Sequence, residues 1–402
     1  MDCCVHKSFR YKNALIIGLS IASIAAISYA LVLRRRKQLR KKNLSKSFNA
    51  LMPNQLDSAR DIKSQISSIP INIKREMPIS SFTIKGHLGS GQFGSVQKGE
   101  LKEKCQTDAV TAVAVKSIQG ISTKDDVENF LKEIKIMGYL DHHLNLVSMI
   151  GSCTQDYEKH GQMFLVLEYC MHGDLKKFLM ENKANILDGE QSDNMNIRSL
   201  ILWAYEIAKG MQYLEENQIM HGDLAARNIL LHKDPCNIGH SVAKIADFGL
   251  AKNFYENVEY KKESRVLIPW KWMALEYLTY NVLTLKSDVW SFGVVLWEIF
   301  SFGKAPYGLQ EYDEVLEKLE RGYRLPCPAE VETISSNLPK QLYETLSEIC
   351  FIESPNNRPT FYEVATMIGM ELTKEELNRY IENTTTYHSH YVGNYLSLNK
   401  KK

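Results

Sequence analysis

The sequence predicts an α+β fold with two lobes, a smaller strand-rich lobe followed by a larger helical one, behind a single transmembrane helix. Three observations predict it. An uncharged run lies near the N-terminus, alternating apolar residues dominate from about 82 to 116, and helical periodicity dominates beyond about 175. The expected parts are a short extracellular segment (1–13), the transmembrane helix (14–33), a basic juxtamembrane linker (34–78), the folded domain (79–375) and a flexible C-terminal tail (376–402).

The composition is that of ordinary globular material. Of the 402 residues 44% are hydrophobic and 24% charged, so the chain can bury a large core. Eight cysteines stand without regular spacing and form no Cys/His cluster, which favours reduced thiols over a disulfide framework or a zinc site. The net charge of +2 is uninformative as a total, and we expect no nucleic-acid partner.

The run from Ala14 to Leu33 holds 20 residues and no charge. A helix of that length reaches about 30 Å, the thickness of a bilayer's hydrocarbon layer. A buried core helix would have to be apolar on every face. A cleaved signal peptide is a second alternative, because Ser28-Tyr29-Ala30 loosely matches a cleavage site, but the basic residues that follow form a stop-transfer flank.

Charge asymmetry predicts how this segment is oriented. Three basic residues precede it and eight follow it through Lys46, so the positive-inside rule places the N-terminus outside and the domain in the cytoplasm, as a single-pass protein of the cell membrane. The basic stretch is either a topology signal alone or also a contact with anionic membrane lipid. Small residues recur at every fourth position, by chance or as the contact of a homodimer through the transmembrane helix: Gly18, Ala22, Ala26 and Ala30.

Within the folded domain, alternating apolar runs over Phe82–Lys116 predict three strands. Apolar residues at 127, 130, 131, 134 and 137 predict a helix over Asp125–Tyr139, and the apolar run 163–169 predicts a buried strand. After about Leu372 the chain turns polar, which predicts the flexible tail. Six helices are predicted between these points: Leu175–Met180, Ile197–Leu214, Ser287–Phe300, Tyr312–Glu320, Lys340–Cys350 and Thr360–Met370.

Two short motifs carry the chemistry. HGDLAARN occupies 221–228, and Asp247-Phe248-Gly249 follows it. One carboxylate that accepts a hydroxyl proton, together with an amide and a second carboxylate that hold Mg²⁺, is the set that phosphoryl transfer needs. Upstream stand the glycine-rich LGSGQFGSV (88–96) and VAVK (113–116), an apolar run that ends in a lysine.

These motifs, in this order, resemble those of protein kinases over residues 79–372. The resemblance implies a two-lobed kinase fold around a cleft, with ATP and Mg²⁺ as cofactors and Mn²⁺ as an alternative metal. Asp223 would be the catalytic base, and Asn228 and Asp247 the metal ligands. Lys116 would contact the α- and β-phosphates and pair with Glu133, whose helix buries neighbouring apolar residues and so turns this carboxylate toward the cleft.

The resemblance also implies an ATP-binding set. Glycines in the loop would let the backbone approach the phosphates closely. Leu167 would guard the back of the pocket, and the backbone of the next residues would meet adenine. The expected ATP-binding residues are Leu88, Gly89, Ser90, Gly91, Gln92, Phe93, Gly94, Ser95, Val96, Ala114, Lys116, Glu168, Cys170 and Leu230.

Two local signatures are similar to those of tyrosine kinases. Ala225 stands where serine/threonine kinases carry a lysine, and Arg227 completes the DLAARN loop of receptor-type tyrosine kinases. The segment 269–274 (PWKWMA) resembles their substrate-docking segment, and the stretch from Asp247 to Glu276 is most similar to fibroblast-growth-factor-receptor kinases. The expected function is therefore a membrane-anchored receptor-type tyrosine kinase that acts on protein tyrosines and on itself.

Departures from the family leave other readings open. Gly222 replaces the arginine that pairs with an activation-segment phosphate, so activity should depend less on the regulatory Tyr260. Leu275 replaces a family proline, although Glu276 remains to pair with Arg358. A pseudokinase scaffold that binds nucleotide and partners without turnover is one alternative, and a serine/threonine kinase is another. Phosphotyrosine-reading adaptors are expected partners of four tail tyrosines, at 380, 387, 391 and 395.

Overall fold

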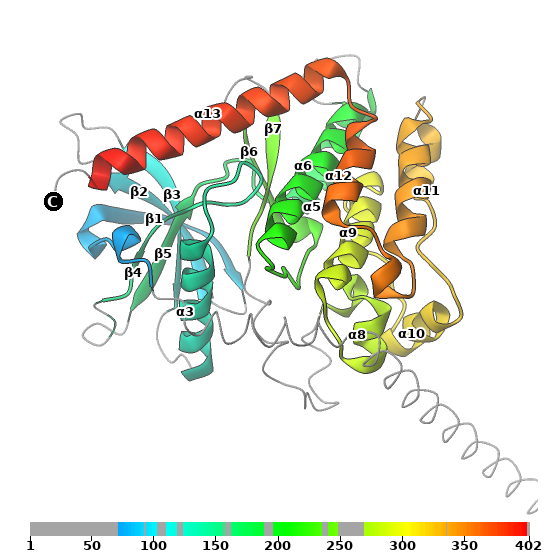
Figure 1. Cartoon of the computed structure of the whole chain (residues 1–402), viewed down its shortest axis with the longest axis horizontal. Helices are drawn as coiled ribbons and strands as arrows, with labels where there is room; N and C mark the ends of the chain where they lie inside the picture. The colour runs from blue at the N-terminus through cyan, green and yellow to red at the C-terminus, as the bar shows by residue number, and fades with distance from the viewer. Residues whose placement is uncertain are drawn as a thin grey trace, which may run out of the picture. The chain divides into compact units, whose positions relative to one another are not determined.

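In the computed structural model, a strand-rich part is followed by a helix-rich part (Figure 1), as the sequence predicts. The expected segments 1–13 and 14–33, and most of the linker 34–78, lie outside the described residues. Within the part of the chain that is described, no helix combines the length and the apolar character needed to span a bilayer. The structure describes residues 71–91, 94–102, 110–118, 124–155, 157, 162–188, 196–234, 240–247, 269–334 and 336–399, with only the backbone of 90, 91, 124, 125, 188, 333 and 390–399.

Five antiparallel strands form one sheet in the order β1-β2-β3-β5-β4. On one face Val113 and Val115 are fully buried against Phe82, Phe164 and Val166. The sequence predicted four of these strands and missed β4, whose MIGSC has no alternating pattern. The strands are β1 (Phe82–Gly91), β2 (Gly94–Lys102), β3 (Val110–Ile118), β4 (Met149–Cys153) and β5 (Met163–Glu168).

The predicted helix α3 (Lys124–Tyr139) packs with the opposite side chains of β5. Successive residues of a strand point to opposite faces, so Met163 and Leu165 turn away from the first cluster. They join Phe130 and Ile134 of α3 in a second, larger core that continues into the helical part. The 3.6-residue periodicity in the sequence therefore marked the side of α3 that faces the sheet.

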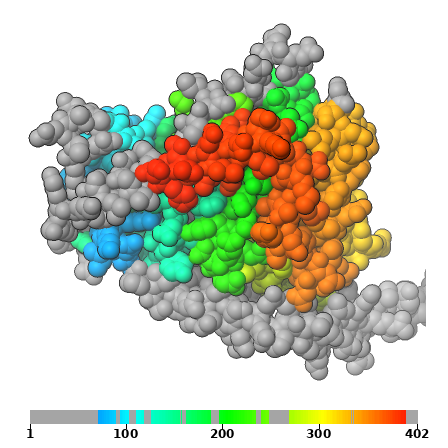
Figure 2. Space-filling model, turned by 45° about the horizontal axis from the view of Figure 1, so that its top comes forward, coloured from blue at the N-terminus to red at the C-terminus, as the bar shows by residue number. Residues whose placement is uncertain are grey.

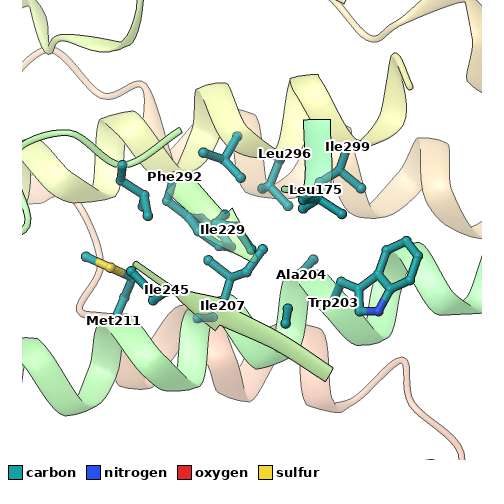
Figure 3. Packing of buried hydrophobic residues seen from close by; sticks show 14 of the residues in the cluster. Leu175, Trp203, Ala204, Ile207, Met211, Ile229, Ile245, Phe292, Leu296 and Ile299 are labelled. Atoms are coloured by element: carbon teal, nitrogen blue, oxygen red, sulfur yellow. The ribbon is translucent and has the colours of Figure 1, made fainter. Parts of the chain in front are cut away.

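The centre of the helical part lies between α6 (Ile197–Glu216), α9 (Leu285–Phe300) and the hairpin of β6 (Ile229–Lys233) and β7 (Ser241–Ile245). Figure 3 shows Ile207, Phe292 and Leu296 around Ile229 and Ile245 of this hairpin. All five side chains are fully buried.

All six predicted helices are present, with ends shifted by a few residues or, for α5, extended to Asp188. The remaining helices are α5 (Leu175–Asp188), α8 (Leu275–Tyr280), α10 (Tyr312–Glu320), α11 (Leu338–Cys350), α12 (Phe361–Gly369) and α13 (Lys374–Asn399), and the 3₁₀ turns are η1 (Ile73–Arg75), η2 (Ile79–Ser81), η3 (Ala226–Asn228), η6 (Trp270–Trp272), η7 (Ala329–Thr333) and η8 (Pro355–Asn357).

The two parts are joined by backbone hydrogen bonds at the segment that follows α3. Ile245 N donates to the Asn145 carbonyl, and Val147 N donates to the Ile245 carbonyl, each at 2.8 Å. Leu146 and Ile245 thereby form a parallel β-bridge. This bridge fixes the end of β7, immediately before Asp247, to the strand-rich part.

The folded domain begins earlier than the predicted boundary at residue 79. Arg75 donates to the carbonyls of Met137 and Met149 at 3.4 Å and of Leu140 at 3.5 Å. Residues 71–78, assigned to the linker from their polar composition, therefore pack against α3 and β4. Asn72, Glu76 and Met77 add further hydrogen bonds to Gly138 and Ser152, and composition does not reveal such contacts because they join segments that are distant in the sequence.

The C-terminal segment also differs from the expectation. Residues 376–402 were expected to be a flexible tail, whereas α13 runs to Asn399 as one helix. Tyr380 is 8% exposed and Tyr387 6% exposed, packed with Leu144 and Val242. The helix is ordered because two aromatic side chains on one face are buried by tertiary contact, although most of its residues are polar.

Candidate active site

The HGDLAARN segment (221–228) is anchored by a buried carboxylate of α9. Asp288 accepts the N–H of His221 at 2.8 Å and the N–H of Gly222 at 2.9 Å. Burial raises the pKa of Asp288 to about 7, and these two hydrogen bonds oppose the rise. Gly222 has a φ of 76°, a backbone conformation that L-residues rarely adopt. Glycine therefore suits the backbone at the position where the family carries arginine.

Asp223 is held on both carboxylate oxygens. Oδ1 accepts from Arg227 at 2.5 Å, and Oδ2 accepts from the amide nitrogen of Asn228 at 2.8 Å. Burial raises the pKa of Asp223 to about 6, although Arg227 and Asn228 pull it down. A carboxylate with a pKa near the working pH is well suited to accept a proton from a hydroxyl group.

His221 joins this loop to the residue before Asp247. Its Nδ1 accepts the Asp223 N–H at 3.2 Å, so the proton is on Nε2, which donates to the Ala246 carbonyl at 3.1 Å. Burial lowers the pKa of His221 to about 4, which keeps the ring neutral. The N–H of Ala246 donates to the Asn228 carbonyl at 2.8 Å. Both polar backbone groups of Ala246 are thus bonded to the loop, and Asp247 follows beside Asn228.

Lys116 connects the sheet to Asp247. Its Nζ donates to Glu133 at 2.8 Å and to Asp247 at 3.0 Å, which is the pairing expected for Glu133. Burial alone would lower the pKa of Lys116, but Glu133 and Asp247 outweigh burial and raise it. Asp247 itself has a φ of 61°, an uncommon backbone conformation for a residue other than glycine, of a kind that concentrates at functional sites.

The glycine-rich segment forms the turn between β1 and β2, where Gly91 pairs with Gly94. Gly94 has a φ of 131°, and a Cβ there would lie 2.2 Å from the Ser117 carbonyl oxygen, so only glycine fits. A Cβ at Gly89 would meet no protein atom within 4 Å, so packing does not dictate glycine at that position.

The other expected ATP-binding residues lie on neighbouring elements. Val96 pairs with Lys116, and Ala114 pairs with Leu167, in adjacent strands of the sheet. Cys170 is buried, and Leu230 lies in β6. Of the remaining expected positions, Gln92 and Phe93 lie outside the described residues, and Ser90 and Gly91 are described by their backbone alone.

The donor set suits a hard divalent cation. The nitrogen of the Asn228 amide donates to Asp223, which leaves the amide oxygen as the ligand atom, and Asp247 supplies a carboxylate. No group of three or more His, Cys, Asp or Glu with metal-binding geometry occurs among the described residues. Two protein oxygens fit Mg²⁺, which usually takes one or two carboxylates and completes its shell with phosphates and water.

The predicted docking segment contacts the HGDLAARN segment (221–228), the expected catalytic loop, through Trp272. The guanidinium of Arg227 lies 4.4 Å from the centre of the Trp272 ring. The buried carboxylate of Glu298 accepts the Trp272 indole N–H and the Ala226 N–H, both at 2.8 Å on the same oxygen. The segment 269–274 and the catalytic loop are therefore held as one unit.

A family model described as protein tyrosine and serine/threonine kinase matches residues 82–368, which include all of the site described above. The chain belongs to this kinase family. Fibroblast growth factor receptor 1 of Pleurodeles waltl is 35% identical over 285 residues, 69% of this chain. The kinase domain is thus similar to that of a fibroblast growth factor receptor, and the match covers 33% of the receptor's own length.

The kinase domain also contains the expected pair in its helical part. Arg358 donates to both oxygens of Glu276, at 2.8 and 2.6 Å, and both side chains are buried. Ser287 adds a third hydrogen bond to the same carboxylate at 2.8 Å. Leu275, which replaces the family's proline, leaves this contact intact.

The structure brings Lys116, Glu133, Asp223, Asn228 and Asp247 into one connected network with Arg227, while Tyr260 lies outside the described residues. Sequence reasoning missed Asp288 and Glu298, which hold the loop by its backbone. A signal was present, because Asp288 and Glu298 stand among the apolar residues of a mostly buried helix, and a buried charge needs a partner.

Proposed function

We propose that this kinase transfers the γ-phosphate of ATP to tyrosine residues of proteins, itself included. One observation carries the proposal. The Glu133–Lys116–Asp247 chain of hydrogen bonds meets the Asp223–Asn228 pair through the backbone of Ala246. The Lys116 ammonium, two side chains that can bind a metal and one that can accept a proton therefore converge. Phosphoryl transfer requires this positioning more than covalent chemistry by the protein.

In the proposed reaction the tyrosine oxygen bonds to the γ-phosphorus as the bond to the ADP oxygen breaks. Asp223 takes the hydroxyl proton, and Lys116 holds the α- and β-phosphates. Asn228 and Asp247 would hold Mg²⁺, or Mn²⁺ as an alternative, which neutralises charge on the phosphates during transfer. Arg227 keeps Asp223 in place and lowers its pKa below the value that burial alone would produce.

Three features support tyrosine as the acceptor. Ala225 offers no charged group two residues after Asp223, Arg227 packs on Trp272 of the segment 269–274, and the kinase domain is similar to that of a fibroblast growth factor receptor. Because the segment 269–274 is already packed on this loop, it offers the ring of a substrate tyrosine a fixed surface beside Asp223.

The test uses the full chain in detergent with labelled ATP and two peptides that differ only in a tyrosine or serine acceptor. We expect labelled phosphotyrosine, and we expect Asp223→Asn to lower kcat by about 10²–10⁴-fold. Label on serine would instead indicate a serine/threonine kinase. Turnover no greater than that of the Asp223→Asn variant would indicate a pseudokinase scaffold.

We further propose that activity depends little on Tyr260, because Gly222 has no side chain to hold a phosphate. The Tyr260→Phe variant should keep most of the peptide-phosphorylating activity of the parent chain. Loss of that activity on purified protein would contradict this proposal.

Membrane anchoring through 14–33 is proposed from the uncharged run and its basic flank, with the kinase domain in the cytoplasm. The full chain should resist alkaline carbonate extraction from cell membranes, whereas a variant without 14–33 should be released. Release of both proteins would argue against a transmembrane helix. The proposed partners are tyrosine-bearing substrates, anionic lipid, a second copy of the chain and phosphotyrosine-reading adaptors. Of the four tail tyrosines expected to recruit adaptors, Tyr380 and Tyr387 are buried, so the adaptors are proposed for Tyr391 and Tyr395 alone.

A further inference from the structure

Tyr387 of α13 reaches a buried polar cluster beside the end of β5. Its hydroxyl donates to Oε1 of Glu168 at 3.0 Å and lies 2.6 Å from the Ser148 hydroxyl. The Nζ of Lys244 lies 3.9 Å from the centre of the Tyr387 ring. A residue 219 positions downstream of Glu168 thus contacts it directly.

The cluster holds the Glu168 carboxylate from several sides. Oε1 also accepts the Ser148 N–H at 2.7 Å and the Lys244 ammonium at 3.1 Å. Lys244 donates in addition to the Leu144 carbonyl at 2.7 Å. The side chains of Lys244 and Glu168 are only 1% and 5% exposed, so their interaction is little screened by solvent.

The hydroxyl of Tyr387 completes a chain of hydrogen bonds in which the donors and acceptors are consistent. Because it donates to Glu168, it must accept from Ser148, whose oxygen in turn lies 3.0 Å from Nδ1 of His142. Burial, and then the nearby Arg75, lower the pKa of His142 to about 4, so this ring is neutral and donates through Nδ1. Every hydroxyl in the chain therefore both donates and accepts.

Glu168 stands where the kinase family's nucleotide site begins. Its backbone N–H donates to the Ser148 carbonyl at 3.0 Å, and it is followed by the hinge segment (168–170), whose backbone is expected to meet adenine. The side chain of this residue points to Tyr387, while its backbone belongs to the ATP-binding set. Glu168 therefore connects α13 to the hinge segment within one residue.

The rest of the same α13 face is fixed to the helical part. Glu376 binds Arg198 of α6 at 2.8 and 2.5 Å, and Asn383 donates to Asp234, just after β6, at 3.0 Å. Figure 1 shows α13 passing β6 and β7 toward the sheet, and Figure 2 shows α13, in red, on the surface. Contacts at 376, 383 and 387 thus run from α6 to the hinge segment.

We propose that Tyr387 is a positioning residue for nucleotide binding. By its hydrogen bond to Glu168 it holds the backbone of the hinge segment in the position that binds adenine. This inference rests on the proposed kinase function. If α13 only covered the surface, a substitution of Tyr387 would lower stability and would not weaken the binding of ATP more than that of peptide. A positioning role predicts that, among the kinetic constants, only nucleotide affinity changes.

The experiment compares Tyr387→Phe with Tyr380→Phe in the full chain. Tyr380 is a matched control, because it is as buried, lies on the same face of α13 and donates one hydrogen bond, at 2.9 Å to Asn145 rather than to the hinge segment. Tyr387→Phe should raise the KM for ATP by about three- to tenfold, with kcat and the KM for peptide nearly unchanged. Tyr380→Phe should lower the Tm similarly but leave the KM for ATP unaltered.

Two readouts do not require turnover. Calorimetric titration with ADP should show the same loss of affinity, and amide hydrogen exchange in 163–172 should quicken in Tyr387→Phe but not in Tyr380→Phe. Unchanged affinity and exchange in Tyr387→Phe, or equal changes in both variants, would overturn the proposal even if the chain proves inactive as a kinase. Ser148→Ala, which removes the hydroxyl's other partner, should reproduce a weaker form of the effect if Tyr387→Phe folds poorly.

Discussion

Asp288 shows how a single residue prepares the site without touching a substrate. Its two oxygens satisfy two consecutive backbone N–H groups of the catalytic loop. Asp288→Ala leaves both donors buried and unpaired, and we expect it to reduce the free energy of unfolding by about 2–4 kcal/mol and to lower kcat. Asp288→Asn keeps one oxygen and should lose less of both. Urea unfolding and steady-state kinetics measure the two effects, and equal losses in the two variants would contradict this role.

Glu206 of α6 carries a prediction about pH. Burial raises its pKa to about 8 from an ordinary value of 4.5, and the Ala243 N–H that it accepts at 2.7 Å opposes the rise. Asp234, Arg379 and Lys244 add smaller effects. Between these two pH values the folded state holds a proton that the unfolded state has lost, so stability falls as pH rises through the window.

Glu206→Gln removes this titration while keeping an oxygen for Ala243. Relative to the parent chain, the variant should gain Tm progressively between about pH 5 and pH 8. Thermal unfolding across that range tests the sign. A constant Tm difference between the two proteins would show that Glu206 does not titrate in the window.

At the scale of elements, the prediction concerns α13, whose removal should lower the thermal stability of the domain. Ending the chain after Thr373 exposes the surface around Val242 and removes one hydrogen-bond partner each from Asn145 and Glu168, namely Tyr380 and Tyr387. With two largely buried tyrosines lost, we expect the Tm to fall by about 5–10 °C.

The matched control is Ile381→Ala, since Ile381 lies on α13 but is 60% exposed. It should leave the Tm within about 1 °C, as surface substitutions usually do. If ending the chain after Thr373 also left the Tm within about 1 °C, α13 would not be docked on the domain as described.

At the scale of the whole molecule, Gly210 of α6 lies where the strand-rich and helix-rich parts meet. A Cβ there would lie 2.8 Å from the Asn145 carbonyl oxygen and 2.7 Å from Cδ1 of Ile245. Glycine to alanine in a helix normally gains about 1 kcal/mol. Here the clash with backbone should dominate, so Gly210→Ala is expected to lose about 1–3 kcal/mol in urea unfolding.

Gly138 of α3 provides the comparison. Its nearest neighbour to an added Cβ is Asn72 Cβ at 3.4 Å, an ordinary contact. Gly138→Ala should therefore be neutral or stabilising. A loss for Gly138→Ala as large as that for Gly210→Ala would mean that the junction is not the cause.

Predictability from the sequence varied with how local the interactions are. The pairing of Lys116 with Glu133 followed from a motif and a helical stripe, and Asp223 with Asn228 lies within one short loop. Asp288 and Glu298 accept hydrogen bonds from backbone groups that lie 66 or more positions earlier in the sequence. No local sequence pattern predicts which backbone groups these are. β4 lacked an alternating pattern because its first four residues are all buried, so both faces of the strand are covered.

By itself the sequence determined four strands of the five-stranded sheet, helix α3 and six of the later helices, the kinase motifs and the residues expected to touch ATP and metal, because periodicity and short loops are set by neighbours along the chain. Only the tertiary structure decided that residues 71–78 belong to the folded domain and that the polar C-terminal segment is a helix with Tyr387 against Glu168. These outcomes depend on burial between distant segments, and whether a mostly polar helix is stable depends on the surface that receives its few aromatic side chains.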